Sequence, residues 1–499
     1  MKIRIILLIA FAVVNMRINA QTGGIIVSPG TTITEESGST IDITYGNLLL
    51  QDDYNSSPSF IQKGSLHFTA GGDAKVEQYL NKDRWHIISS PVQYEVNGAY
   101  IWMYLYKYVE PSNSFVYMNQ PTTQPLNPGQ GYYVWAYTTD PNGTFPPSAD
   151  SAVLQGILNS QDINLTLTVT DSSPKSGWNL IGNPFPCGLN WNGNSDWNLT
   201  NLDATVWIWD PIAGNHKTWN YSTGIGTLQS GEIAATQGFW VHAHDTTGAS
   251  ATSLTLPASQ RLHTTNDFYK NSQPELPNHL KLKVEGNTQE NDETIIGFTD
   301  IATPEPNSQL DALYLEGSET SPSLYVRIAG NSYAVKELPD WETFHTVPIG
   351  FKAGIPGLYT LSADWTETFP SDLDIFLEDK KENYQQNLRI NPQYKFAADM
   401  NDFPGRFTVR FGKQLSIPKQ NIAQGVNIFS FERKVFLIID LKDFLTGKCI
   451  IFDLTGRKVL EKTVIQGKNI IATNFERGYY LVTFISNENM VSKKIFITN

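Results

Sequence analysis

The stretch FDLTGRKVL (residues 452–460), with GYYLVTFI (residues 478–485) after it, decides the fold class of this 499-residue chain. In the first motif a glycine and two basic residues separate two apolar segments, a pattern that indicates two strands joined by a tight turn. In the second, Gly478 precedes a run of aromatic and β-branched residues, which is typical of a strand. A third alternating run, VSKKIFI (residues 491–497), lies close to the end of the sequence. Together the motifs predict a small all-β domain over residues 426–499.

In their order and position these motifs resemble the type A C-terminal sorting domain of proteins exported by the type IX secretion system of Bacteroidetes. The resemblance implies an immunoglobulin-like sandwich whose sorting motif comprises Asp453, Gly456, Arg457, Gly478, Tyr480, Lys493 and Lys494. It implies two partners, the outer-membrane translocon of that system and a sortase-like peptidase that removes the domain. It also implies secretion across the outer membrane to the cell surface or the extracellular space, where surface lipopolysaccharide or another glycan is a further expected partner.

The N-terminal segment agrees with export. Lys2 and Arg4 precede an apolar run over residues 5–14, and Ala20 offers a small residue just before Gln21. This order is that of a signal peptide, with cleavage expected between Ala20 and Gln21. The apolar run is too short to span a bilayer, and no later stretch is longer, so we expect no transmembrane segment in the mature chain.

The composition favours strands and turns over helices. Aromatic residues make up 12% of the chain, alongside 37 Gly and 27 Pro. Alternating apolar and polar positions recur along most of the sequence, whereas helical periodicity is nearly absent. We therefore predict an all-β protein with several sandwich-like domains in series. The only two cysteines, Cys187 and Cys449, lie far apart, so we expect both to be buried, with no disulfide and no thiolate metal site.

The net charge of −13 is unevenly distributed. Residues 414–499 hold 12 Lys and Arg against 7 Asp and Glu, a balance of +5, so residues 1–413 carry −18. An acidic body argues against nucleic acid or anionic lipid as the main partner.

Turn-rich segments divide the chain into seven parts: a signal peptide (1–20), an N-terminal β region (21–84), an aromatic β-domain (85–263), a linker (264–278), a β-sandwich (279–412), a second linker (413–425) and the sorting domain (426–499). The N-terminal region has short strands broken by Gly and Asn, which fits a small sheet layer or a few rungs of a β-solenoid. Seven alternating runs predict the strands of the sandwich: residues 280–284, 294–298, 324–328, 347–351, 357–361, 375–377 and 406–411.

The aromatic domain contains an internal repeat, with copies at residues 85–136 and 178–243. WHIISSP (residues 85–91) opens the first copy and WNLIGNP (residues 178–184) the second, while QGYYVWA (residues 130–136) and QGFWVHA (residues 237–243) close them. The second copy is longer, and its extra residues fall in the turn-rich stretch around 190–197. The alternation places the large side chains on one face of each strand, so we expect them to form a core.

A search for catalytic patterns finds no Gly-x-Ser-x-Gly elbow, no His-Glu-x-x-His and no phosphate-binding glycine loop, so no catalytic, cofactor or metal residue is assigned and the protein is expected not to be an enzyme. His242 and His244 share a strand face at ligand-like spacing, with His216 or Asp245 as conceivable third ligands. A half-exposed strand pair is the preferred interpretation.

Three acidic or polar loops are also interpreted structurally. Residues 190–196 hold several oxygen donors but only one carboxylate, which favours a turn over a Ca²⁺ loop. The pairs Asp52 with Asp53 and Asp399 with Asp402 are expected to be loop charges, not catalytic carboxylates.

Trp191, Trp197 and Trp219 lie in or beside the polar loops of the second copy. Local packing or anchoring of the loops is the preferred interpretation, and stacking on sugar rings is the alternative. The leading hypothesis is an exported, non-enzymatic β-protein that acts in adhesion or as envelope structure. One alternative is a carbohydrate-binding surface protein that uses the second repeat copy, and another is a hydrolase with an unrecognised site.

Overall fold

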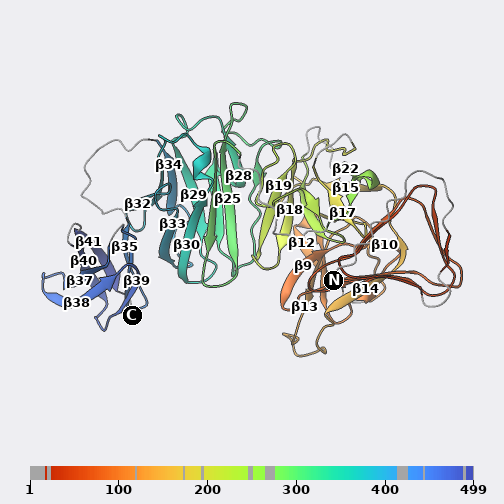
Figure 1. Ribbon diagram of the computed structural model, residues 1–499, viewed down its shortest axis with the longest axis horizontal. Helices are drawn as coiled ribbons and strands as arrows, with labels where there is room; N and C mark the ends of the chain where they lie inside the picture. The colour runs from red at the N-terminus through yellow and green to blue at the C-terminus, as the bar shows by residue number, and fades with distance from the viewer. Residues whose placement is uncertain are drawn as a thin grey trace. The chain divides into compact units, whose positions relative to one another are not determined.

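The regular secondary structure of the described residues is almost entirely β-strand (Figure 1). The computed structural model describes residues 17–19, 24–118, 121–171, 175–192, 196–244, 251–264, 276–412, 425–441, 444–486 and 490–497. Its helical turns are the short 3₁₀ segments η1 (Asn97–Tyr100), η2 (Glu110–Ser112), η3 (Ala258–Gln260) and η4 (Thr366–Thr368). The predicted all-β fold is confirmed. Within the described ranges, no helix is long and apolar enough to cross a membrane.

The chain forms two compact units. The first comprises residues 1–211, 219–224 and 228–272, and the second comprises residues 212–218, 225–227 and 273–499. The predicted linkers fall largely on residues 265–275 and 413–424, which lie outside the described residues, as do Ala20 and Gln21 of the predicted cleavage site.

The first unit begins with parallel ladders of short strands. The strands are β1 (Arg17–Asn19), β2 (Ile25–Val27), β3 (Thr32–Glu35), β4 (Thr40–Ile43), β5 (Leu48–Leu50), β6 (Ser59–Gln62), β7 (Ser65–Phe68) and β8 (Ala74–Tyr79). They pair as β1-β4-β7, β2-β5-β8 and β3-β6, so that Ile25 lies beside Leu48 and Leu48 beside Ala74. Stacking of successive coils in parallel is the pairing of a β-solenoid, one of the two arrangements that the sequence allowed. Strand β1 lies inside the predicted signal peptide.

The two repeat copies have the same strand order. The first copy is a sheet of β9 (Arg84–Ile88), β13 (Tyr132–Ala136), β11 (Tyr104–Val109) and β12 (Ser114–Tyr117). The second is a sheet of β16 (Trp178–Gly182), β21 (Gly238–His242), β18 (Thr205–Asp210) and β19 (Asn215–Asn220). In each sheet the closing strand therefore lies between the first strand and the second.

Smaller strands complete the first unit. β14 (Ser151–Leu158) extends the solenoid sheet between β8 and β10 (Val92–Gln93). β15 (Ile163–Thr168) pairs with β22 (Ala251–Leu256), and β17 (Gly188–Asn190) pairs with β20 (Glu232–Ile233) and β23 (Arg261–Leu262).

The second unit contains an eleven-stranded sheet that folds over one core. Its strands are β24 (His279–Glu285), β25 (Asn291–Phe298), β26 (Ala312–Leu313), β27 (Ser323–Ile328), β28 (Asn331–Leu338), β29 (Thr346–Lys352), β30 (Gly357–Asp364), β31 (Ile375–Asp379), β32 (Tyr384–Asn387), β33 (Gln393–Ala398) and β34 (Phe407–Phe411). Phe351 of β29 packs against Phe396 of β33, and Phe396 packs against Phe407 of β34, so distant parts of the sheet face each other. All seven predicted strands are present, with four more.

The sorting domain is a two-sheet sandwich. One sheet has the order β35-β36-β39 and the other β38-β37-β40-β41. The strands are β35 (Val426–Phe431), β36 (Lys434–Ile439), β37 (Thr446–Asp453), β38 (Lys458–Ile465), β39 (Gly467–Ala472), β40 (Gly478–Ile485) and β41 (Met490–Ile497). Inward residues such as Leu437, Ile451 and Val482 are fully buried and form its core.

Candidate functional site

The three tryptophans for which glycan contact was the alternative to local packing are buried. Trp191 is 1% exposed, Trp197 8% and Trp219 7%. Each indole N–H is satisfied inside the protein: Trp191 donates to the carbonyl of Ala204, Trp197 to that of Asn190, and Trp219 to Oδ1 of Asn192. A sugar needs an exposed ring face on which to stack, so the glycan assignment is wrong for these residues and local packing is the correct interpretation.

An aromatic cavity of about 550 Å³ is lined instead by residues of the first repeat copy and of the segment that follows it, up to Phe145. We call it the aromatic groove. Its described lining is Asn97, Ile101, Trp102, Met103, Tyr104, Tyr106, Tyr117, Thr122, Tyr137, Asn142, Thr144 and Phe145. This set contains aromatic rings, hydroxyls and amides but no charged side chain. Trp102, Tyr117 and Phe145 are 41%, 41% and 39% exposed, so ring surface faces solvent.

One wall of the groove is a loop organised by Asp140. The carboxylate of Asp140 accepts hydrogen bonds from the backbone amides of Asn142, Thr144 and Phe145, at 3.1, 2.7 and 2.9 Å. The Tyr104 hydroxyl donates to the same carboxylate at 2.7 Å, and this bond lowers the pKa of Asp140 to about 2 and raises that of Tyr104 to about 12. Both groups therefore keep one protonation state at neutral pH, which fixes the loop on strand β11.

Another part of the lining, at Trp102, has backbone in an unusual conformation. Trp102 has φ of 62°, in the left-handed region that a bulky side chain rarely adopts. Its ring lies 5.2 Å from that of Phe145, centroid to centroid, at an interplanar angle of 39°. Strained backbone is concentrated at functional sites in proteins, which makes this position a candidate for ligand contact.

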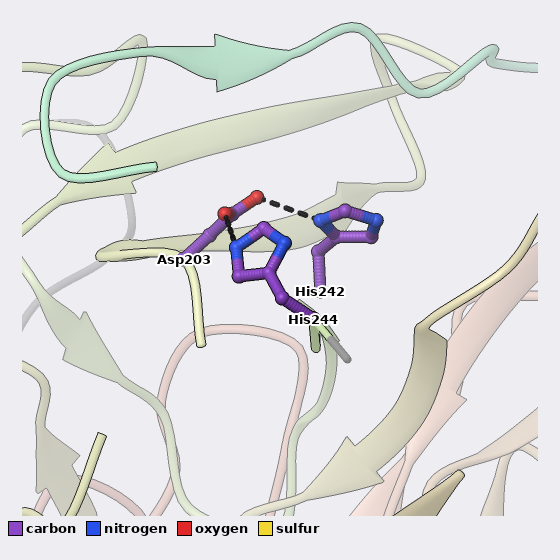
Figure 2. A group of neighbouring side chains, drawn as sticks. All are labelled: Asp203, His242 and His244. Atoms are coloured by element: carbon purple, nitrogen blue, oxygen red, sulfur yellow. Dashed lines mark hydrogen bonds and ion pairs between the residues drawn. The ribbon is translucent and has the colours of Figure 1, made fainter. Parts of the chain in front are cut away.

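A second cluster joins Asp203, His242 and His244 (Figure 2). His242 Nδ1 lies 2.9 Å from one carboxylate oxygen of Asp203, and His244 Nε2 lies 2.5 Å from the other. The side chain of Asp203 is 4% exposed, that of His242 14% and that of His244 31%. The shared strand face of the two histidines was visible in the sequence, whereas Asp203, from the loop before β18, was not identified.

The charges of the cluster stabilise one another. Burial opposes ionisation of Asp203, but its contacts with His242 and His244 outweigh burial and lower its pKa. The same contact with Asp203 raises the pKa of His244. His216, one of the residues considered as a third ligand, is not part of this cluster, and Asp245 lies outside the described residues.

The acidic pairs have structural partners. Asp52 accepts a hydrogen bond from the amide of Tyr79, and burial raises its pKa to about 6, while Asp53 caps the turn at residues 55–56. Asp402 pairs with Arg406 and Lys381.

The other acidic residues considered as sites, Asp399 and Asp196, lie in loops, and the two cysteines lie in cores. Asp399 accepts from the amide of Asn401. Asp196, at the end of the oxygen-rich loop, binds Ser259 and Gln260, whereas residues 193–195 of that loop lie outside the described residues. Cys187 and Cys449 are both buried and unbonded, and burial raises the pKa of each thiol to about 12.

The residues of the sorting motif shape turns and strand edges. Asp453 accepts hydrogen bonds from the amides of Thr455 and Arg457, and Gly456 has φ of 82°, so these residues form the turn between β37 and β38. The Tyr480 hydroxyl donates to the carbonyl of Glu476, at the turn before β40. Gly478 opens that strand.

The two lysines of the motif occupy the last strand. Lys493 on β41 pairs with Glu382 at 3.0 Å, and the ammonium of Lys494 lies 4.2 Å from the ring centre of Tyr479.

Fold and motif geometry together define the class, a secreted all-β protein that ends in a sorting sandwich. Residues 433–498 match the family described as the secretion system C-terminal sorting domain. This match confirms the resemblance seen in the sequence. The protein is therefore sorted by the type IX secretion system, as in Bacteroidetes, crosses the outer membrane and reaches the cell surface or the extracellular space.

The body of the chain has its own family. Residues 3–411 match the family described as domain of unknown function DUF8693, and the chain belongs to it. Comparison with curated proteins finds no match. Among solved structures, the chain is similar at 7% identity to one titled "Biofilm associated protein - BSP domain", over 85% of this chain and 92% of that one, with a TM-score of 0.17. A likeness of that size supports no conclusion about fold or function.

Proposed function

We propose that this protein acts outside the cell as a non-enzymatic adhesin or envelope component, and that its aromatic groove binds neutral carbohydrate. The proposal has two supports. Export by the type IX system delivers the chain to the surface, and the groove presents solvent-exposed rings there. The exposed rings of the groove are the observation that carries the proposal.

The chemistry of the groove favours a sugar over other small ligands. Aromatic faces give apolar contact to the C–H faces of a sugar ring, and nearby amides and hydroxyls such as Asn142 and Thr144 can bind its hydroxyl groups. The lack of a charged side chain in the described lining disfavours a phosphate, a nucleotide or a charged peptide, because nothing there pairs with the charge. A volume near 550 Å³ matches a ligand of one or two sugar rings on the usual scale of binding pockets.

The stable loop at Asp140 supports a preformed site. Because three backbone amides and the Tyr104 hydroxyl converge on one carboxylate, the wall that carries Asn142 and Phe145 is held before any ligand arrives. A preorganised wall lowers the entropic cost of binding.

A glycan array with the full chain tests the proposal. We expect the wild type to bind a subset of neutral glycans, and Trp102→Ala and Tyr117→Ala to weaken binding by about 30-fold, since truncation of an aromatic anchor costs about 2 kcal/mol. Tyr45→Ala, which removes an aromatic side chain that is 58% exposed and lies outside the groove, serves as the matched control. Bound glycans should be recovered uncleaved. The carbohydrate assignment is contradicted if the wild type binds no glycan, or if both groove variants bind as tightly as the wild type. Cleavage of a bound glycan contradicts the assignment as a non-enzymatic protein.

A further inference from the structure

We propose that Asp203, His242 and His244 form a binding site for a divalent transition-metal ion, with Zn²⁺ as the expected occupant. The site is separate from the aromatic groove and independent of the proposed function. One ligand atom from each residue can be chosen so that all three lie within 4.8 Å of one another. Figure 2 shows both imidazole rings turned toward the single carboxylate.

The donor set matches the preference of zinc. Zn²⁺ is bound by imidazole nitrogen and carboxylate oxygen at about 2.0–2.2 Å, and sites with three protein ligands keep a fourth position for water. Imidazole nitrogens also disfavour the hard cations Mg²⁺ and Ca²⁺, which take oxygen ligands. His244 is 31% exposed, so an ion can enter from solvent on that side.

The hydrogen bonds of His242 leave a nitrogen that needs a cation. His242 Nε2 lies 3.2 Å from the carbonyl oxygen of Ser176, which can only accept, so this nitrogen carries a proton. In a neutral imidazole the other nitrogen, Nδ1, then presents a lone pair to the Asp203 carboxylate 2.9 Å away. Two lone pairs facing each other repel, unless a proton or a metal ion lies between them. Donation of the distal nitrogen to a backbone carbonyl is also the usual arrangement of a metal-bound histidine.

The contact between His244 and Asp203 also favours a cation between the two side chains. His244 Nε2 and Asp203 Oδ1 form an ion pair at 2.5 Å, but the contact lacks hydrogen-bond geometry, and both atoms are buried without another hydrogen-bond partner among the described residues. A buried carboxylate oxygen whose one partner is poorly aligned gains less than a well-formed hydrogen bond would give. A metal ion would satisfy both atoms after a small outward rotation of the His244 ring.

The backbone holds the ligands in place before an ion binds. The amide of Asp203 donates to the carbonyl of His242 at 2.9 Å, and the amide of His244 donates to the carbonyl of Asn201 at 2.7 Å. Leu202, just before Asp203, and Ala243, between the two histidines, form an isolated antiparallel bridge. The three ligands therefore sit on two backbone segments that are already joined, and such preorganisation favours metal affinity.

Protons and the metal compete for the same atoms. Both histidines must be neutral at the ligating nitrogen to bind Zn²⁺, so affinity should fall as the pH is lowered from about 8 to about 5. The alternative without a metal is a pair of protonated histidines clamped to one carboxylate, and this alternative predicts no Zn²⁺ binding.

Calorimetric titration of the full chain, purified without a polyhistidine tag, with Zn²⁺ alone tests the site. We expect one ion per chain in the wild type. His244→Ala and Asp203→Asn each remove a ligand, and each should weaken Zn²⁺ affinity by at least 10–100-fold, which is the loss seen when only a residue that supports a ligand is changed. His345→Ala removes an exposed histidine elsewhere and should bind as the wild type does. Circular dichroism of each variant shows whether it folds.

Substitution with Co²⁺ adds a readout that is independent of folding energy. A visible absorption spectrum of four-coordinate Co²⁺ is expected for the wild type and His345→Ala and should be absent for His244→Ala. Absence of saturable binding by the wild type overturns the proposal. Binding that persists in both His244→Ala and Asp203→Asn overturns it as well, because the ion then lies elsewhere.

Discussion

Trp240 of the second repeat copy lies edge-on to Tyr108 of the first, with ring centroids 4.8 Å apart and an interplanar angle of 73°. This geometry places the positive edge of one ring against the negative face of the other. Tyr133, on the closing strand of the first copy, also contacts Trp240. A hydrogen bond from Trp209 Nε1 to the carbonyl of Trp85 joins the two sheets at a second point. The inner aromatic residues of the repeats therefore hold the two copies together.

Substitution Trp240→Ala should destabilise the aromatic domain by about 3–5 kcal/mol, because it empties a buried site and removes its ring contacts. Guanidinium denaturation, monitored by near-ultraviolet circular dichroism, measures the effect. The first unfolding transition is the readout, since a chain of several domains need not unfold in one step. Tyr45→Ala, at an exposed position, should change stability by less than about 0.5 kcal/mol. If Trp240→Ala unfolds at the same guanidinium concentration as the wild type, the two copies do not depend on this contact.

The buried ion pair of the sandwich makes a second prediction. Arg406 is fully buried and binds Asp379 through two hydrogen bonds of 3.0 and 2.6 Å. Arg406→Ala should destabilise the sandwich by about 3–5 kcal/mol, because the Asp379 carboxylate stays buried without its partner. Lys381→Ala provides the control, since this lysine is 37% exposed and its partner Asp402 keeps Arg406 as a second partner, so the loss should be about 0–1 kcal/mol. Equal thermal midpoints for the two variants would contradict this ranking.

The strands that sequence could predict are those with clean alternation. The hairpin at residues 452–460 and the seven runs of the sandwich all appear where the pattern indicated. Strand β28 (Asn331–Leu338) was missed because it carries Lys336 and Glu337 at buried positions. Lys336 pairs with Asp311 at 2.7 Å and Glu337 with His279 at 2.9 Å, and only the folded chain brings these partners together. A buried charge looks like a surface residue in a sequence until its partner is known.

The sites were harder to predict than the strands, because burial and long-range neighbours are not visible in a sequence. A repeat shows which positions carry aromatic rings, but burial decides which of them meet solvent. Trp191 is buried against Trp197 and Phe239, whereas Trp102 of the first copy is exposed on a turn that alternation does not reveal. The spacing of His242 and His244 indicated a shared face, but Asp203 precedes His242 by 39 residues, and no local pattern connects them. The DPNGTF segment (residues 140–145), with its Asp at the start of a turn, was the one available signal of the groove loop.

A buried carboxyl group should make the stability of the second unit depend on pH. Asp292 is 2% exposed, and burial raises its pKa to about 7, although it accepts hydrogen bonds from Tyr314 and the amide of Leu324. Its pKa in the unfolded chain is about 3.9, so the folded state binds the proton more tightly. The stabilisation from this group is fully present below about pH 4 and is lost as the pH rises through about 7.

The slope of stability against pH is the readout for Asp292. Urea denaturation at several pH values between about 4 and 8 should show a decline for the wild type and a flatter curve for Asp292→Asn. Asp364→Asn, at an exposed position, should retain the wild-type slope. If the Asp292→Asn slope equals that of the wild type, another group is responsible.

Export should depend on the sorting domain. A chain that lacks residues 426–499 keeps its predicted signal peptide, so it should enter the periplasm and remain there. Immunoblots of periplasmic, surface and medium fractions measure the distribution, with a periplasmic marker as control for lysis. Appearance of the truncated chain at the surface would contradict the assigned route.

The turn at Asp453 should control the order of the β37–β38 hairpin. Its carboxylate accepts hydrogen bonds from the amides of Thr455 and Arg457, both at 3.0 Å, and from the Thr455 hydroxyl at 2.6 Å. The Thr455 hydroxyl is the main cause that lowers the pKa of Asp453 to about 2. Because this value lies below that of an unfolded aspartate, near 3.9, the turn is stabilised above about pH 4 and loses that support as the pH falls through about 2.

Asp453→Ala should therefore speed amide hydrogen exchange at residues 455 and 457 at neutral pH, while residues of the core strand β40 exchange as in the wild type. Glu461→Gln alters an exposed pair with Lys458 in the same hairpin and is the control. Unchanged exchange at residues 455 and 457 in Asp453→Ala would mean that the Gly456 backbone alone sets the turn, and that the aspartate of the sorting motif has a role other than shape.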